Sequence, residues 1–258
     1  MIVPCQTLTP GYPNDCGQQE QIMQRTLAKL KKGEHITIVA FGDSITEITF
    51  HTRGGMNWVG LLSEAIFETY GNGICTLINA GKCASTYANS LDRLDRDVLR
   101  FLPDLVILAF GMNDAGGGRD YLEKFKAIVR ETIRRIRDKC GSEILICTPN
   151  PIVTVNGLPL PDEQPWPGKP WESETRPVGR YADALVDIAK ETDCSVVNHY
   201  HAWTSKTFNC KHAVADPTGL WLRMGDAIHP GYLGHLAFFR EIAPLFDVPL
   251  YFPWEEAE

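Results

Sequence analysis

The sequence predicts one α/β domain, in which five parallel strands form a sheet between two layers of helices. Short apolar segments alternate with segments of helical periodicity along most of the chain, which is typical of a doubly wound sheet. The chain has 258 residues, a length that suits one large domain. Hydrophobic residues make up 44% of the sequence, enough for a sizeable core. We therefore expect a single domain over residues 1–258.

Five apolar segments are expected to be the strands. They are short, and most lack the apolar–polar alternation of a strand with one face in water. Unbroken apolar segments of this length indicate strands buried on both faces, as in a parallel sheet. The segments are 36–41, 75–79, 105–110, 144–147 and 195–197.

Helices are expected between these strands. The clearest pattern covers 121–136, where apolar residues recur at helical spacing and Lys, Arg and Glu occupy the opposite face. Gly141 follows this pattern and is expected to end the helix. The other expected helices are 19–31, 57–70, 90–101, 178–191 and 231–245.

Two segments fall outside the alternation. About 1–16 is expected to be an N-terminal extension. Residues 149–177 contain eight prolines together with Trp166 and Trp171, a composition that excludes regular helix or strand. A long loop in a compact domain is usually functional or disordered. We interpret 149–177 as a flap over the site at the strand ends, with a surface loop without a role as the alternative.

Charge and hydropathy argue against nucleic-acid and membrane partners. The formal net charge is -7, whereas a nucleic-acid binder needs a basic face. The densest basic cluster, Arg134, Arg135 and Arg137, belongs to the polar face of an expected helix. No segment reaches the ~18 apolar residues of a membrane span. Because residues 1–13 do not resemble a signal peptide, we expect a cytoplasmic protein.

The eight cysteines are widely spaced and form no C-x-x-C pair. This spacing disfavours a zinc site, and a disulfide framework is typical of small secreted chains. We expect reduced thiols, and a disulfide involving Cys5 and Cys16 is the open alternative.

The residues directly after the strands carry the chemistry, because ligands of open α/β sheets bind beyond the carboxyl ends of the strands. Taken singly, each motif has an ordinary structural explanation as a turn or a helix cap. The motifs are Gly42-Asp43-Ser44-Ile45-Thr46, Asn79-Ala80-Gly81, Gly111-Met112-Asn113-Asp114 and, late in the chain, Asp226-Ala227-Ile228-His229-Pro230.

The spacing of Asp226 and His229 favours a functional pair. Side chains three positions apart can meet on one turn of the chain. The carboxylate then holds the imidazole Nδ1–H and leaves Nε2 free to face a serine. Gly42 permits a tight turn that places Ser44 beside backbone N–H groups, and Asn113 can donate a hydrogen bond into the same crevice.

Together and in this order, the four motifs resemble those of the SGNH hydrolases, the GDSL-like esterases and lipases, over about 35–246. The resemblance implies a flavodoxin-like three-layer sandwich. It also implies ester hydrolysis without a metal or any other cofactor.

The same resemblance implies a role for each matching residue. Ser44 is the nucleophile, His229 is its general base, and Asp226 orients the imidazole. The oxyanion hole is expected from the N–H groups of Ser44 and Gly81 and from the side-chain amide of Asn113.

The expected substrate is a small acyl ester, and the aromatic flap favours an acetyl group on a carbohydrate. Asp43, Trp166 and Trp171 are the candidates for substrate contact. A general short-chain carboxylesterase and an acyl thioesterase are the enzymatic alternatives. The sequence leaves self-association into a homo-oligomer open.

Other functional classes find less support. The G-x-S-x-G elbow of α/β-hydrolases and the Walker pattern are both missing. His199 and His201 alternate onto one face of an expected strand, without a third metal ligand. A carbohydrate-binding module is the non-enzymatic alternative, and its stacking residues would be Trp58, Trp166, Trp171, Trp203 and Trp221.

Overall fold

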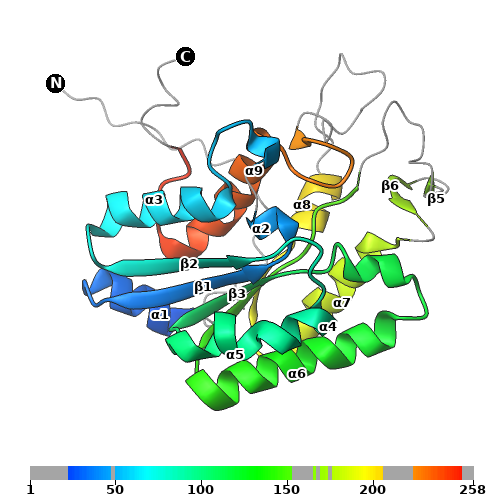
Figure 1. Cartoon of the computed structure of the whole chain (residues 1–258). Helices are drawn as coiled ribbons and strands as arrows, with labels where there is room; N and C mark the ends of the chain where they lie inside the picture. The colour runs from blue at the N-terminus through cyan, green and yellow to red at the C-terminus, as the bar shows by residue number, and fades with distance from the viewer. Residues whose placement is uncertain are drawn as a thin grey trace.

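A five-stranded parallel sheet forms the centre of the molecule (Figure 1). The computed structural model describes residues 23–47, 50–152, 176–205 and 223–251, and the backbone of 165–166 and 169–173. The strand order is β2-β1-β3-β4-β7, and neighbouring strands pair in parallel. This order confirms the predicted flavodoxin-like sheet. The strands are β1 (Ile36–Gly42), β2 (Cys75–Gly81), β3 (Leu105–Ala109), β4 (Glu143–Cys147) and β7 (Ser195–Val197).

Helices cover both faces of the sheet, which confirms the predicted three layers. Figure 1 shows α3 and α9 over one face, and α5, α6 and α7 over the other. At the amino ends of β3 and β4, α1 is held by Lys29, which bonds Asp104 at 2.6 Å, and by Thr26, which bonds Glu143 at 2.6 Å. The helices are α1 (Gln24–Lys31), α2 (Ser44–Glu47), α3 (Trp58–Tyr70), α4 (Tyr87–Ser90), α5 (Leu94–Asp97), α6 (Leu122–Cys140), α7 (Val178–Glu191), α8 (His199–Ser205) and α9 (Tyr232–Ile242).

The core lies on the central strands. Nearly every side chain of β1, β3 and β4 is buried, as their unbroken apolar sequences predict. In β2, most side chains remain partly exposed, because this strand lies at the edge of the sheet. The predicted burial therefore holds for the inner strands and fails at the edge.

The amphipathic helix predicted around 121–136 is α6. Its buried face includes Phe125, Val129, Ile133 and Ile136, the apolar positions of the sequence pattern. Gly141 ends the helix in a left-handed conformation, with φ of 62°, and its N–H bonds the carbonyl of Arg137.

The predicted helix over 90–101 is wrong, since this stretch folds into short pieces. It contains α5 and two 3-10 turns, Leu91–Arg93 and Leu99–Phe101. The buried Arg93 side chain bonds the carbonyls of Ala80 and Gly42 at 2.8 and 2.9 Å and lies over the Phe41 ring. Tertiary contacts of this buried cation override the helical pattern of the sequence.

The expected strand over 195–197 is confirmed as β7, but the placing of His199 and His201 on one face of a strand is wrong, since both residues lie in α8. His199 is buried, and its Nδ1 lies 2.6 Å from Glu241 Oε2. Trp203 Nε1 donates to the other oxygen of Glu241 at 3.1 Å. The interior partners of His199 therefore give it a packing role.

Part of the 149–177 segment is also more regular than predicted. Backbone pairing joins β5 (Pro165–Trp166) and β6 (Lys169–Ser173) in a two-stranded antiparallel ladder. Both strands of a two-stranded ladder are edge strands, where proline is tolerated. Within the expected flap, residues 153–164, 167–168 and 174–175 lie outside the described residues, as does the expected N-terminal extension.

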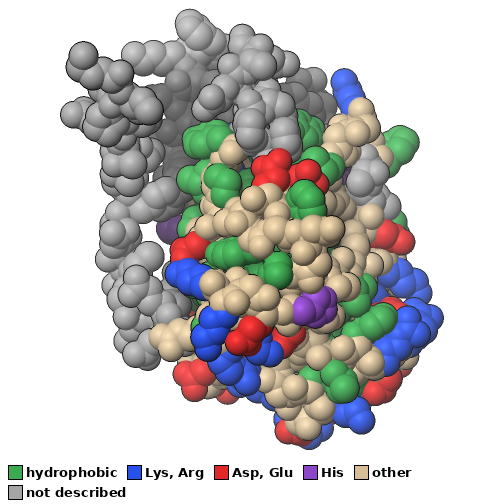
Figure 2. All heavy atoms as spheres, turned by 90° about the vertical axis from the view of Figure 1, so that its left-hand side faces the viewer, with side chains coloured by type: hydrophobic (Ala, Val, Ile, Leu, Met, Phe, Trp, Pro, Cys, Tyr) green, Lys and Arg blue, Asp and Glu red, His purple; other side chains and the backbone are tan. Residues whose placement is uncertain are grey.

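Surface charges are mixed on the side of the molecule where β1 and β2 begin. Figure 2 shows Lys and Arg side chains next to Asp and Glu on this face. The pairs at α6, such as Arg134 with Glu131 and with Asp138, follow the same pattern. No helix among the described residues is long and apolar enough to cross a membrane.

The cysteines of the described part are free thiols. Burial raises the pKa of Cys75 to about 12 and also raises the pKa of Cys147 and Cys194. Cys5 and Cys16 lie outside the described residues.

Candidate active site

Ser44 is placed by a tight connection from β1 into α2. A Cβ on Gly42, the last residue of β1, would lie 2.1 Å from Thr46 Oγ1 and 2.8 Å from the Ala109 carbonyl oxygen. Only glycine fits at this position. Asp43 Oδ1 accepts the Ile45 N–H at 2.9 Å and thereby fixes the first turn of α2. The Ser44 side chain is held at the carboxyl end of β1, an inner strand of the sheet.

The Asp226–His229 loop brings the second half of the site from the other end of the chain. Met224 and Pro230 pair as an antiparallel bridge that closes the loop. Asp226 Oδ1 accepts the N–H groups of Ile228 and His229 at 2.7 and 2.6 Å. Its Oδ2 lies 2.8 Å from His229 Nδ1. Four consecutive positions therefore form a compact carboxylate–imidazole unit.

The unit faces the serine. Ser44 Oγ lies 3.0 Å from His229 Nε2, across a sequence separation of 185 residues. An ionised carboxylate only accepts hydrogen bonds, so the Nδ1 beside Asp226 carries the proton. Nε2 is then the acceptor for the Ser44 hydroxyl. The three side chains form a chain of hydrogen bonds from carboxylate to hydroxyl.

Asp226 is ionised in this arrangement. Partial burial by itself raises the pKa of the Asp226 carboxyl. Hydrogen bonds from the His229 side chain and from the His229 and Ile228 N–H groups outweigh that effect, and the net pKa lies well below the ordinary value. The carboxylate therefore supplies a fixed negative charge next to the imidazole.

Gly81 has a structural reason to be glycine. A Cβ there would lie 2.3 Å from the Glu47 backbone nitrogen, so the missing side chain lets α2 approach β2. The Gly81 N–H donates to Asn79 Oδ1 at 2.9 Å. This bond occupies the donor that the sequence assigned to the oxyanion hole.

The loop after β2 contains a different backbone donor. The N–H groups of Cys83, Ser85 and Thr86 donate to Glu47 Oε2, the Lys82 carbonyl and Asn89 Oδ1. Ala84 lies between them, exposed, in a left-handed conformation with φ of 57°. Among the described residues, no acceptor bonds the Ala84 N–H.

Asn113 is on the same side of the site. Its Nδ2 donates to the Ser85 carbonyl at 3.0 Å, which ties the end of the β3 segment to the loop that holds Ala84. A side-chain amide has two N–H donors, and this bond uses one. Among the described residues, no acceptor is found for the second hydrogen.

The other residues predicted to contact substrate are placed differently. Asp43 is 2% exposed, beneath the turn that it stabilises. Burial raises its pKa to about 7, although the Ile45 N–H, His229 and Arg93 oppose the shift. This burial argues against contact between Asp43 and a substrate. Trp166 and Trp171 belong to β5 and β6, and their side chains lie outside the described part.

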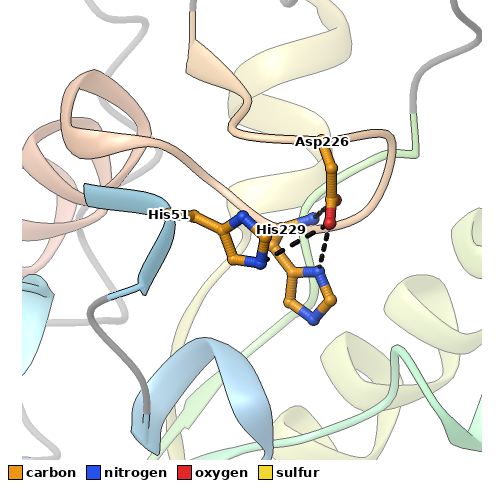
Figure 3. Close-up of side chains that lie close together, drawn as sticks. All are labelled: His51, Asp226 and His229. Carbon is orange, nitrogen blue, oxygen red and sulfur yellow. Dashed lines mark hydrogen bonds and ion pairs between the residues drawn. The ribbon is translucent and has the colours of Figure 1, made fainter. Parts of the chain in front are cut away.

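His51 is the site residue that the sequence analysis missed. It lies in the 3-10 turn Phe50–Thr52, and its Nε2 is 3.5 Å from Asp226 Oδ2 (Figure 3). No motif surrounds it. The only signal was a histidine seven positions after Ser44, which is too common to be informative.

His51, Asp226 and His229 are the one group in the described part of the chain whose ligand atoms lie close enough for a metal ion, within 4.8 Å of one another. The two imidazole rings are stacked at an interplanar angle of 8°. Nitrogen lone pairs lie in the ring planes, and nearly parallel stacked planes do not meet at one ion. This geometry does not suit joint coordination by both histidines.

Solved structures of esterases share the fold. An acetylxylan esterase from Geobacillus stearothermophilus has a TM-score of 0.62 and 20% identity, covering 84% of this chain and 97% of its own. The acetyl xylan esterase AlAXEase has a TM-score of 0.63 and 21% identity, covering 81% and 98%. An α/β hydrolase enzyme from the metagenome of Lake Arreo, Spain, has a TM-score of 0.60 and 20% identity, covering 82% and 95%.

Among curated proteins, none matches the chain significantly. A family model does match, and it spans residues 40–237, which include both halves of the site. Since this match covers most of the described fold, the chain belongs to the GDSL-like lipase/acylhydrolase family.

Proposed function

We propose that the protein is a serine esterase that removes short acyl groups, foremost acetyl, from carbohydrates through an acyl-enzyme. One observation carries the proposal: the 3.0 Å contact between Ser44 Oγ and His229 Nε2, with His229 Nδ1 held by Asp226. The family match supports the same reaction class. The described catalytic mutants of the Geobacillus esterase replace a serine, an aspartate or a histidine, and they support the same set of roles.

Each group has one chemical task. Ser44 Oγ attacks the ester carbonyl while His229 Nε2 takes its proton. The imidazolium then gives that proton to the leaving alcohol, which leaves an acyl-serine. Water attacks the acyl group by the same route and regenerates the enzyme. Asp226 keeps the imidazole in the required tautomer and stabilises its cationic form.

The negative charge that forms on the carbonyl oxygen needs donors. We assign them to the Ser44 N–H, the second Nδ2 hydrogen of Asn113 and the Ala84 N–H. Ala84 takes the place of Gly81 in this proposal, because the Gly81 N–H already donates to Asn79. Donors of this kind act by being in place before the charge develops.

The nucleophile is tested by replacing Ser44 with alanine. The variant should lose detectable hydrolysis of p-nitrophenyl acetate and lose labelling by a fluorophosphonate, while keeping the thermal unfolding midpoint within a few degrees. Ser63→Ala, at an exposed position of α3, is the matched control and should behave as the wild type. Unchanged hydrolysis by Ser44→Ala would remove the proposed mechanism.

The substrate class rests on the fold neighbours, two of which are acetylxylan esterases. We expect kcat/KM to be highest for the acetyl ester in a series of p-nitrophenyl esters from C2 to C10. We also expect release of acetate from acetylated xylo-oligosaccharides. A maximum at C6 or longer, with no acetate released from the oligosaccharides, would favour a general carboxylesterase instead.

A purely sugar-binding protein finds less support. Trp58 and Trp203, two of its candidate stacking residues, are 2% and 0% exposed. Buried rings offer no platform to a sugar. The single-domain organisation, self-association and a cytoplasmic location stay predictions.

A further inference from the structure

A second imidazole lies against the proposed catalytic base. The rings of His51 and His229 are stacked, with centroids 4.6 Å apart and an interplanar angle of 8°. Each ring has a nitrogen close to the same carboxylate oxygen. Asp226 Oδ2 lies 2.8 Å from His229 Nδ1 and 3.5 Å from His51 Nε2. Figure 3 shows the two histidines converging on Asp226 from different segments of the chain.

Packing holds His51 in this position. A Cβ added to Gly225 would lie 2.6 Å from the His51 Cβ, so the loop that carries Asp226 runs directly against His51. On its other side, the Phe50 ring meets the His51 ring edge-on, with centroids 5.2 Å apart. The His51 side chain is 17% exposed. The stack is therefore built into the fold at the point where the loop and the 3-10 turn meet.

We propose that neutral His51 is a positioning residue for the esterase reaction: it keeps the His229 ring and the Asp226 carboxylate aligned with Ser44, and protonation of His51 abolishes this function. The proposal rests on the proposed function of the site. A neutral ring presents an electron-rich face, which favours the imidazolium that forms on His229 during catalysis. A protonated ring in the same stack repels that cation instead.

Burial favours the neutral form of His51. Burial lowers the pKa of His51; Asp226 opposes this shift, and His229 adds to it. His235, in α9, is the third histidine of the cluster. Burial lowers the pKa of His235 to about 4, with further lowering from His51 and His229. Asp226 and His229 are the titratable groups found to act on His51: the carboxylate favours a protonated His51, and a positive charge on His229 opposes it.

The test compares His51→Phe and His51→Ala with the wild type over a range of pH. Phenylalanine retains a flat ring in the stack but has no titratable nitrogen and no contact with the carboxylate. We expect kcat at pH 7.5 to fall roughly tenfold in His51→Phe and further in His51→Ala, with KM within about twofold. His35→Phe, which removes an exposed histidine bonded to Thr76, is the matched control and should leave kcat unchanged.

The acid limb of the pH profile separates positioning from a merely structural role. In the wild type, log kcat/KM should fall with a slope that approaches two once the pH is low enough for both His229 and His51 to bind a proton. In His51→Phe the slope should be one, since only His229 remains in the stack and His235 is common to both proteins. Equal slopes, or equal kcat in the folded variants, would overturn the proposal.

Histidine ring resonances in NMR spectra give a readout independent of turnover. In the wild type, the His229 resonances should titrate in two coupled steps, and in His51→Phe in one step. Coupled steps in a protein without esterase activity would overturn the proposed function while supporting the interaction of the two rings. A single step in the active wild type would overturn the proposal for His51 alone.

Discussion

Gly81, the last residue of β2, and Ala84, in the loop that follows, show why a glycine in a motif does not by itself reveal its role. Gly81 is required because the α2 backbone would collide with any Cβ, 2.3 Å away at the Glu47 nitrogen. Ala84, without the freedom of glycine, adopts the left-handed conformation with φ of 57°. That conformation costs an alanine roughly 1–2 kcal/mol, and in our assignment it directs an N–H toward the substrate.

Asn113→Ala tests the side-chain donor of the same assignment. The amide is expected to bond the substrate oxygen mainly when it carries negative charge. The variant should therefore lower kcat about a hundredfold while KM changes little. Initial rates with p-nitrophenyl acetate measure both constants. A rise in KM that accounts for the whole loss would make Asn113 an ordinary binding residue.

At the scale of secondary structure, the segment from α4 to the Leu99–Phe101 turn supports the site through the side chain of Arg93. Arg93 joins three parts of the site, since its guanidinium bonds the Gly42 carbonyl, the Ala80 carbonyl and Ser85 Oγ. These contacts link the end of β1 to the loop that contains Ala84. A regular helix over the same residues would not place the Arg93 guanidinium beside these three acceptors.

Arg93→Lys should show the importance of this link. A lysine keeps the charge but lacks the planar fork of donors, so buried carbonyls lose their partners. We expect the free energy of unfolding to fall by about 2–3 kcal/mol in urea titrations. Arg96→Lys, at an exposed position that pairs with Asp97, is the control and should change stability by less than about 0.5 kcal/mol. Equal stability of the two variants would contradict the role of Arg93.

At the scale of the whole molecule, the sequence predicted the structure correctly where the local pattern of apolar residues matches the burial that the fold imposes. The apolar segments of β1, β3 and β4 predicted inner strands because burial on both faces leaves no polar positions. The motif residues could be placed at the carboxyl ends because parallel strands share that edge. The close approach of Ser44 and His229 was expected from the resemblance of the four motifs to those of the SGNH hydrolases, because the Asp226–His229 loop follows no strand of the sheet in the part of the chain that the structure describes.

Other features depend on three-dimensional contacts that leave no local signal. The break in the 90–101 helix follows from acceptors that Arg93 finds on β1 and β2. His51 joins the site because its turn folds onto the Gly225 backbone, far away in the sequence. Burial of Asp43 depends likewise on the packing of several elements around the first turn of α2.

The distance along the chain between Ser44 and His229 has a consequence for biosynthesis. All five strands of the large sheet are complete by Val197, whereas the loop that carries the imidazole begins only after Arg223. A ribosome working from the amino terminus therefore synthesises all strands of this sheet and the nucleophile before it adds the base. A product that stops before this loop would carry the serine without its base, so the catalytic pair is complete only after His229 has been added.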